Sequence, residues 1–103
     1  MVSIGGEIDL STASAFEEVI EAALVSSPPV LVIDLSDVDF MGSVGLRILV
    51  ATQEKVGKDA QLAIVANSAA TSRPIQLTGL DSILSLYPTL DDALSAVAAE
   101  PNR

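Results

Sequence analysis

The sequence predicts an α/β fold with a single small sheet, mixed and mostly parallel, of about four strands that alternate with helices. Short apolar runs rich in β-branched residues alternate with segments in which apolar residues recur at helical spacing. The chain has 103 residues and 50% of them are hydrophobic, which suits one core rather than two. We therefore expect one domain over residues 1–100, followed by a frayed C-terminal tail at 101–103.

The first strand is predicted over residues 1–8, MVSIGGEI, although glycine is uncommon inside strands. The next segment has apolar residues at helical spacing: Phe16, Val19, Ile20, Ala23 and Leu24. This pattern predicts a helix from about Ser11 to Val25. Ser14 and Glu17 have the spacing of a capping box. Two prolines then end the helix, because proline lacks the amide that a helix would need.

The central segment begins with the run 30–35, VLVIDL, which is typical of the buried strands of parallel sheets. We expect it to be followed by a loop that carries Asp37 and Asp39. A helix is predicted from about Ser43 to Val56, since apolar residues line one side of it and a glycine follows it as a C-terminal stop.

The last third of the chain continues the alternation. A strand is predicted at 61–66, QLAIVA, followed by a helix that Asn67 or Ser68 caps. A short fourth strand at 83–87 and a last helix capped by Thr89 complete the predicted fold.

The composition excludes several classes of function. A net charge of −9, from 14 acidic and 5 basic residues, opposes binding to nucleic acid. The absence of cysteine excludes disulfides, and the absence of histidine removes the commonest general base and metal ligand. We therefore predict no enzyme, no metal site and no cofactor. No signal peptide and no apolar run long enough for a membrane span are recognisable, so a cytoplasmic protein that does not bind membranes is expected.

The stretch 39–46, DFMGSVGL, places Ser43 between two glycines at the expected start of a helix. Four roles are open to its hydroxyl: helix cap, nucleophile, phosphate ligand and phosphate acceptor. A nucleophile elbow requires glycine where Met41 stands and a histidine as base. A phosphate-binding P-loop requires a lysine that this stretch lacks. A helix cap, worth ~1 kcal/mol, is the simplest interpretation that remains.

A cap does not account for the acidic residues expected around this serine. Asp34 lies near the end of the predicted central strand, and Asp37 and Asp39 follow in the predicted loop. Open α/β sheets usually place their working surface at the carboxyl edge of such a strand. We therefore expect these carboxylates to gather there with Ser43.

Three stretches of the chain carry a resemblance to a known family. They are 30–50, VLVIDLSDVDFMGSVGLRILV, together with GEID at 6–9 and LTGL at 77–80. They resemble motifs of the STAS family, which is named for sulfate transporters and anti-sigma factor antagonists. The resemblance spans about Gly5 to Ala98 and implies a STAS fold. Since the family normally has a further strand before its GEID motif, the N-terminal edge strand is expected to be missing or shortened here.

The resemblance implies the function of a bacterial anti-sigma factor antagonist, or anti-anti-sigma factor. Such a protein regulates transcription by binding an anti-sigma factor and releasing its sigma factor. By position, Ser43 matches the serine that the anti-sigma kinase phosphorylates, and Asp9 and Asp34 match flanking acidic residues. The implied partner-binding surface consists of Asp9, Asp34, Asp39, Met41, Gly42, Ser43, Val44, Gly45, Leu46 and Arg47.

Two neighbours of Ser43 depart from the family pattern. Gly42 stands where the family usually has aspartate, and Val44 stands where it often has a second serine or threonine. The implied partners are an anti-sigma factor of the serine-kinase type and a serine phosphatase, with the chain itself a monomer or weak dimer. Two alternatives stay open: an unphosphorylated STAS adaptor of a transporter ATPase or signalling scaffold, and a nucleotide sensor.

Overall fold

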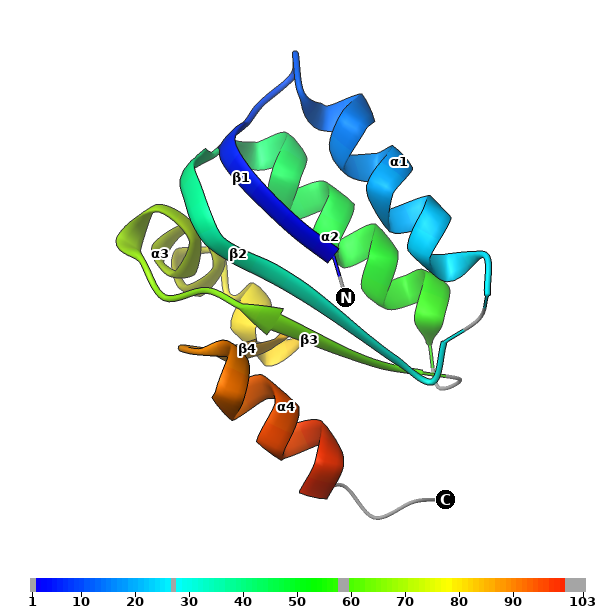
Figure 1. The fold of residues 1–103 in the computed structure, drawn as a ribbon. Helices are drawn as coiled ribbons and strands as arrows, with labels where there is room; N and C mark the ends of the chain where they lie inside the picture. Colours follow the sequence, from blue (N-terminus) through cyan, green and yellow to red (C-terminus); the bar gives the residue numbers. More distant parts are fainter. Residues whose placement is uncertain (1, 27, 58–59, 100–103) are drawn as a thin grey trace.

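The computed structural model describes residues 2–26, 28–57 and 60–99 (Figure 1). The elements follow in the order β1 (Val2–Ile8), α1 (Ala13–Leu24), β2 (Val30–Met41), α2 (Ser43–Val56), β3 (Gln61–Val65), α3 (Ala69–Leu77), the 3-10 helix η1 (Leu80–Ser82), β4 (Ser85–Tyr87) and α4 (Leu90–Ala99). The strands form one four-stranded sheet in the order β1, β2, β3, β4, and these pairings are parallel. The predicted α/β fold class is confirmed, with a sheet that is parallel throughout the described residues.

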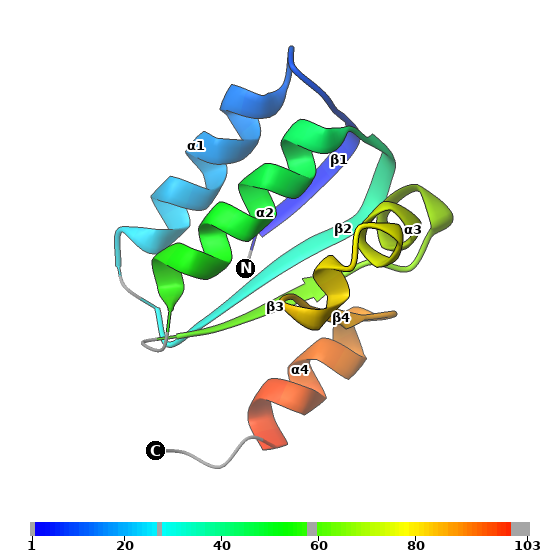
Figure 2. The same ribbon diagram turned by 180° about the vertical axis from the view of Figure 1, so that it is seen from behind.

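Helices cover the two faces of the sheet unequally (Figures 1 and 2). One face of the sheet packs against α1, α2 and α3 and forms the main core with them. Buried residues of this core include Phe16, Ile20, Leu31, Ile33, Leu49, Ile64 and Ile75. On the other face, Ala93 of α4 packs against alternate strand residues: Val32, Ala63 and Val65. Each of α1, α2 and α3 connects two strands that are neighbours in the sheet. Because such connections are right-handed and the strand order runs in one direction, the three helices lie on the same side of the sheet.

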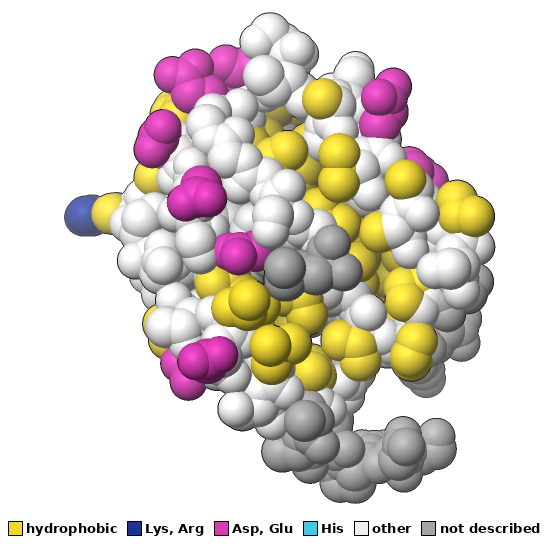
Figure 3. Space-filling view, viewed as in Figure 1, with side chains coloured by type: hydrophobic (Ala, Val, Ile, Leu, Met, Phe, Trp, Pro, Cys, Tyr) yellow, Lys and Arg dark blue, Asp and Glu magenta, His cyan; other side chains and the backbone are white. Residues whose placement is uncertain are grey.

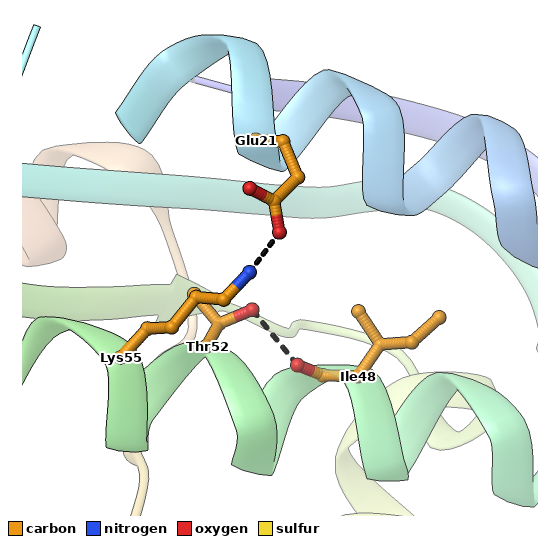
Figure 4. Close-up of polar contacts among 4 residues, drawn as sticks. All are labelled: Glu21, Ile48, Thr52 and Lys55. Carbon is orange, nitrogen blue, oxygen red and sulfur yellow. Dashed lines mark hydrogen bonds and ion pairs between the residues drawn. The ribbon is translucent and has the colours of Figure 1, made fainter. Parts of the chain in front are cut away.

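One ion pair joins α1 to α2, and one hydrogen bond within α2 satisfies a buried hydroxyl (Figure 4). Lys55 of α2 forms an ion pair with Glu21 of α1, and their side chains are 53% and 57% exposed. An exposed pair of this kind contributes only about 0.2–1 kcal/mol. The buried hydroxyl of Thr52 donates a 2.8 Å hydrogen bond to the carbonyl of Ile48, so no polar group of Thr52 is left unsatisfied between the helices.

The central strand is longer than predicted. β2 continues to Met41, so the prediction of a loop at Asp37 and Asp39 is wrong. Its outer half pairs only with β1, and the register between the two strands shifts at two places, each of which adds one residue to β2. Buried residues therefore recur every third position, at Leu35, Val38 and Met41. This three-residue spacing explains why the outer half of β2 was not predicted, because strands are identified in a sequence by two-residue alternation.

The start of α1 also differs from the prediction. α1 begins at Ala13 with Thr12 as its N-cap residue, so the capping box predicted at Ser14 and Glu17 is wrong. The Thr12 hydroxyl instead closes the turn that precedes the helix. It donates to the carbonyl of Glu7 at 2.8 Å and accepts from the amide of Asp9 at 2.9 Å.

Near the C-terminus, the structure agrees more closely with the predicted helix caps and strand. The amide of Asp92 donates to the Thr89 hydroxyl at 3.0 Å, which confirms the predicted cap. Ser68 is the N-cap residue of α3, although its side chain makes no capping bond. The fourth strand begins two residues later than predicted, at Ser85, because η1 and the turn after it occupy the preceding residues. Met1 and the predicted tail lie outside the described residues.

Among the described residues, no helix combines the length and the apolar character needed to cross a bilayer.

Candidate functional site

The ends of β1 and β2 meet the start of α2 at one junction. The amide of Gly42 donates a 2.8 Å hydrogen bond to the carbonyl of Ile8, the last residue of β1. The carbonyl of Gly42 in turn accepts from the amides of Gly45 and Leu46, at 3.0 and 3.4 Å, which starts the helix. Three elements are thus tied together beside Ser43, so its position is fixed by backbone hydrogen bonds.

The junction is close-packed because residue 45 is glycine. A Cβ atom on Gly45 would lie 2.8 Å from Cγ of Met41 and 2.9 Å from Cγ2 of Ile8. Real Cβ atoms essentially never show separations this short, so a side chain at position 45 would force Met41, Ile8 or the backbone around them to shift. Gly45 is therefore a packing residue beneath the surface.

Ser43 is the first helical residue of α2 and is exposed to solvent. The N-cap position belongs to Gly42, whose backbone is extended, and no side chain makes a capping hydrogen bond there. The prediction that Ser43 caps the helix is therefore wrong by one residue. Ser43 is thus exposed at the positive end of the helix dipole, and its hydroxyl makes no capping hydrogen bond.

Asp9 lies in the turn directly after Ile8, so the junction brings it to the same edge as Ser43. Its carboxylate accepts hydrogen bonds from the Ser11 hydroxyl at 2.7 Å and the Ser11 amide at 3.0 Å. The hydrogen bond from the Ser11 side chain is the main reason that the pKa of Asp9 lies below its ordinary value. Asp9 therefore stays ionised at neutral pH and shapes the turn before α1.

Asp34 does not lie beside Ser43. It sits within β2, opposite Ser3 of β1 and Val65 of β3, roughly 20 Å along the strand from Met41. Its carboxylate accepts from the Ser36 hydroxyl at 2.6 Å and from the Ser36 amide at 2.9 Å. The expectation that Asp34 flanks the serine is wrong because β2 does not end at residue 35. Its contacts are those of a structural residue next to a bulge.

The remaining residues of the predicted surface divide by exposure. Asp39, Ser43 and Arg47 are exposed, while Gly42 and Val44 are half-buried. Three others are buried and lie beneath this surface: Met41, Gly45 and Leu46. Arg47 follows Ser43 by four residues, so the two share one face of α2. The solvent-exposed part of the predicted surface is therefore smaller than the sequence suggested.

Sequence reasoning missed two exposed apolar residues at this edge. Leu10 is 87% exposed in the turn after β1, and Phe40 is 52% exposed at the end of β2. A Cβ atom on Gly42 would lie 3.6 Å from the Phe40 ring, so the ring borders the junction. The sequence could not tell which of Phe40 and Met41 faces solvent, because the bulges of β2 reset its alternation.

The surface around the site is acidic. Glu7, Asp37 and Asp39 are exposed along the outer halves of β1 and β2. Figure 3 shows acidic side chains spread over one face, most of them towards its margin, among apolar side chains. Within the described ranges, no three carboxylates converge closely enough to hold a metal ion.

Comparison with known proteins agrees with this fold. The STAS domain family model matches residues 1–93, and the chain belongs to that family. Over 97 residues, covering 94% of the chain and 80% of the relative, it is 54% identical to the anti-sigma-F factor antagonist RsfB of Mycobacterium tuberculosis. An anti-sigma-B factor antagonist of Listeria monocytogenes is 31% identical, with coverage of 82% and 75%.

A solved structure supports the same family. The crystal structure of an anti-sigma factor antagonist from Mycobacterium paratuberculosis superimposes with a TM-score of 0.90 at 60% sequence identity. The match covers 93% of this chain and 82% of that one. The architecture described above is therefore that of an anti-sigma factor antagonist of known structure.

Proposed function

We propose that this protein is an anti-sigma factor antagonist, that the surface around Ser43 binds an anti-sigma factor of the serine-kinase type, and that phosphorylation of Ser43 ends the binding. The observation that carries the proposal is the exposed serine at the first position of α2, held by the hydrogen bond from Gly42 to Ile8. The names of the relatives supply the class of partner. The chain has no catalytic role in this scheme and acts in the cytoplasm.

The fold should tolerate a phosphate on Ser43. The amides of the first helical turn and the helix dipole favour an anion there by about 0.3–1 kcal/mol. Arg47, one turn further along α2, is exposed and within reach of the same face. We therefore expect phosphorylation to leave the structure intact, so that the modification acts on binding alone.

Binding should not tolerate the phosphate. Phosphorylation adds about −1.5 to −2 charge units to a surface that already carries Asp9 and Asp39. A partner that docks against a neutral hydroxyl would have to strip water from a dianion, and this costs several kcal/mol. Since each 1.4 kcal/mol is about tenfold in affinity, a loss of ~100-fold or more is expected. A serine phosphatase would restore binding.

The backbone does not require glycine at position 42. Gly42 has φ −80° and ψ 177°, which any residue adopts, and a Cβ atom there would meet nothing closer than 3.5 Å. The lack of a carboxylate beside Ser43 is therefore a feature of the surface rather than of the fold. It leaves the hydroxyl in a less negative field, which should favour approach of the kinase-bound ATP.

The test compares the wild-type chain with Ser43→Asp, using the anti-sigma-F factor of Mycobacterium tuberculosis as the probe and RsfB as the positive control. Ser95→Asp, at an exposed serine of α4, is the matched charge control. We expect the wild type and Ser95→Asp to bind equally and Ser43→Asp to bind ~100-fold more weakly, with all three melting alike. Failure of the wild type to bind while RsfB binds would overturn the antagonist proposal and favour an adaptor. Equal binding by Ser43→Asp would overturn the switch.

A further inference from the structure

An apolar groove lies next to the Ser43 surface, between the end of β2 and α3. It has a volume of about 430 Å³ and is lined by Asp39, Phe40, Met41, Ala69, Ala70, Arg73, Pro74, Leu77 and Thr78. Leu77 is 77% exposed and Phe40 is 52% exposed, so two large apolar side chains stand in solvent at its sides. Apolar surface gathered in a concave place is typical of a site that another molecule covers.

The groove is continuous with the junction that holds Ser43. Phe40 belongs to both, because its ring borders Gly42 on one side and lines the groove on the other. Met41 also belongs to both, since it lines the groove and lies in contact range of Gly45. A partner large enough to cover Ser43 would therefore extend over the groove.

Charge defines what the groove accepts. Asp39 lies at its edge, and Glu7 stands beside Phe40 in the register of β1 and β2. Asp37, also exposed, precedes Asp39 by two residues on β2, so the strands on this side of the groove carry an acidic rim of Glu7, Asp37 and Asp39, of which Asp39 lines the groove itself. The whole chain carries a net charge of −9. Arg73, exposed on α3, is the only basic residue that lines the groove in the described part of the chain. An apolar side chain flanked by basic residues would match this arrangement.

We propose that the groove is the second half of the partner-binding surface and receives one large apolar side chain from a basic segment of the anti-sigma factor. This inference rests on the proposed function and deepens it. In this arrangement the groove contributes affinity that does not depend on Ser43, while Ser43 decides whether docking is possible at all. The acidic rim steers the basic segment and makes its association sensitive to salt.

Two groove variants test the proposal with the same anti-sigma-F factor as the probe. Leu77→Ser removes an exposed apolar wall, and Ala70→Trp fills the groove with a larger side chain. Val25→Ser is the matched control, because Val25 is 83% exposed but lies just after α1, at the other end of that helix from the junction. We expect Leu77→Ser and Ala70→Trp each to weaken binding about tenfold or more and Val25→Ser to leave it unchanged. Asp39→Asn should reduce the salt dependence of binding.

The outcomes separate the two proposals. If the wild type binds and neither Leu77→Ser nor Ala70→Trp weakens the binding, the proposal that the groove binds the partner is wrong, but the proposed function is not affected. A wild type that does not bind, while RsfB does, would overturn both. If Leu77→Ser changes the oligomeric state of the chain in analytical ultracentrifugation without changing its affinity for the probe, the groove holds a second copy of this chain and the proposal is wrong.

Discussion

The amide of Gly42 donates a 2.8 Å hydrogen bond to the carbonyl of Ile8 and thereby ties the start of α2 to the end of β1. These residues are far apart in the sequence, yet the bond brings the Asp9 turn and Ser43 to one edge of the sheet. The carboxyl edge of a parallel sheet is where α/β proteins place their working residues. The site therefore lies on backbone fixed by three elements, which suits a surface that a partner must recognise without rearrangement.

Gly42→Asp should stabilise the protein. Aspartate is a better N-cap than glycine by a few tenths of a kcal/mol, and its charge favours the helix dipole by about 0.3–1 kcal/mol. The extended backbone of Gly42 accepts a side chain without strain. We expect a gain of about 0.5 kcal/mol, or roughly 2–4 °C in melting temperature, by thermal denaturation. Gly42→Ala, which adds a Cβ but no cap, should give no gain, and a lower melting temperature for Gly42→Asp would contradict this account of the cap.

Gly45→Ala should destabilise the protein although alanine is the better helix former. The added methyl group would overlap Met41 and Ile8, and overpacking of this kind costs about 1–3 kcal/mol. The helical preference for alanine offsets only about 0.5–1 kcal/mol of that cost. We expect a net loss of about 1 kcal/mol in urea unfolding. In a Met41→Ala background the penalty should fall by about half or more, and an unchanged penalty there would show that the contact with Met41 is not its cause.

The limits of sequence reasoning are clearest along β2. Its inner half, at 30–35, has the apolar run of a buried strand and was predicted correctly. Its outer half was not, because two bulges break the alternation and leave Leu35, Val38 and Met41 three residues apart. Bulges depend on how the partner strand pairs, and the sequence of one strand does not contain that information.

The hydrogen bond from Ser11 to Asp9 should be visible in a titration. Because the pKa of Asp9 is lowered in the folded state, its carboxylate stabilises the fold above the unfolded pKa, and this stabilisation is lost as the pH falls through the folded pKa. Ser11→Ala should raise the pKa of Asp9 towards its ordinary value, as measured by NMR of the carboxyl carbon. Ser14→Ala, which leaves the hydrogen bonds of Asp9 intact, is the control. An unchanged Asp9 titration in Ser11→Ala would contradict the assigned cause.

The candidate site was predicted only in part, because some of its residues depend on where β2 ends. The sequence located Ser43 and Arg47 in the first turns of α2, since the boundaries of that helix are marked by its apolar spacing and by Gly57. It wrongly placed Asp34 beside Ser43, because that position depended on where β2 ends. The exposure of Phe40 and the groove against α3 depend on how β2 and α3 pack together. These elements are far apart in the chain, so no local sequence pattern predicts their packing.

The most direct test of the account is to phosphorylate the protein and measure binding. The wild-type chain would be incubated with ATP and the anti-sigma-F factor of Mycobacterium tuberculosis, digested and mapped by mass spectrometry, with Ser43→Ala as the control. The phosphorylated and unphosphorylated chains would then be titrated against the same factor. We predict a single phosphate on Ser43 and an affinity lowered by ~100-fold or more. Phosphate found only on another residue, or equal affinity of the two forms, would contradict the account.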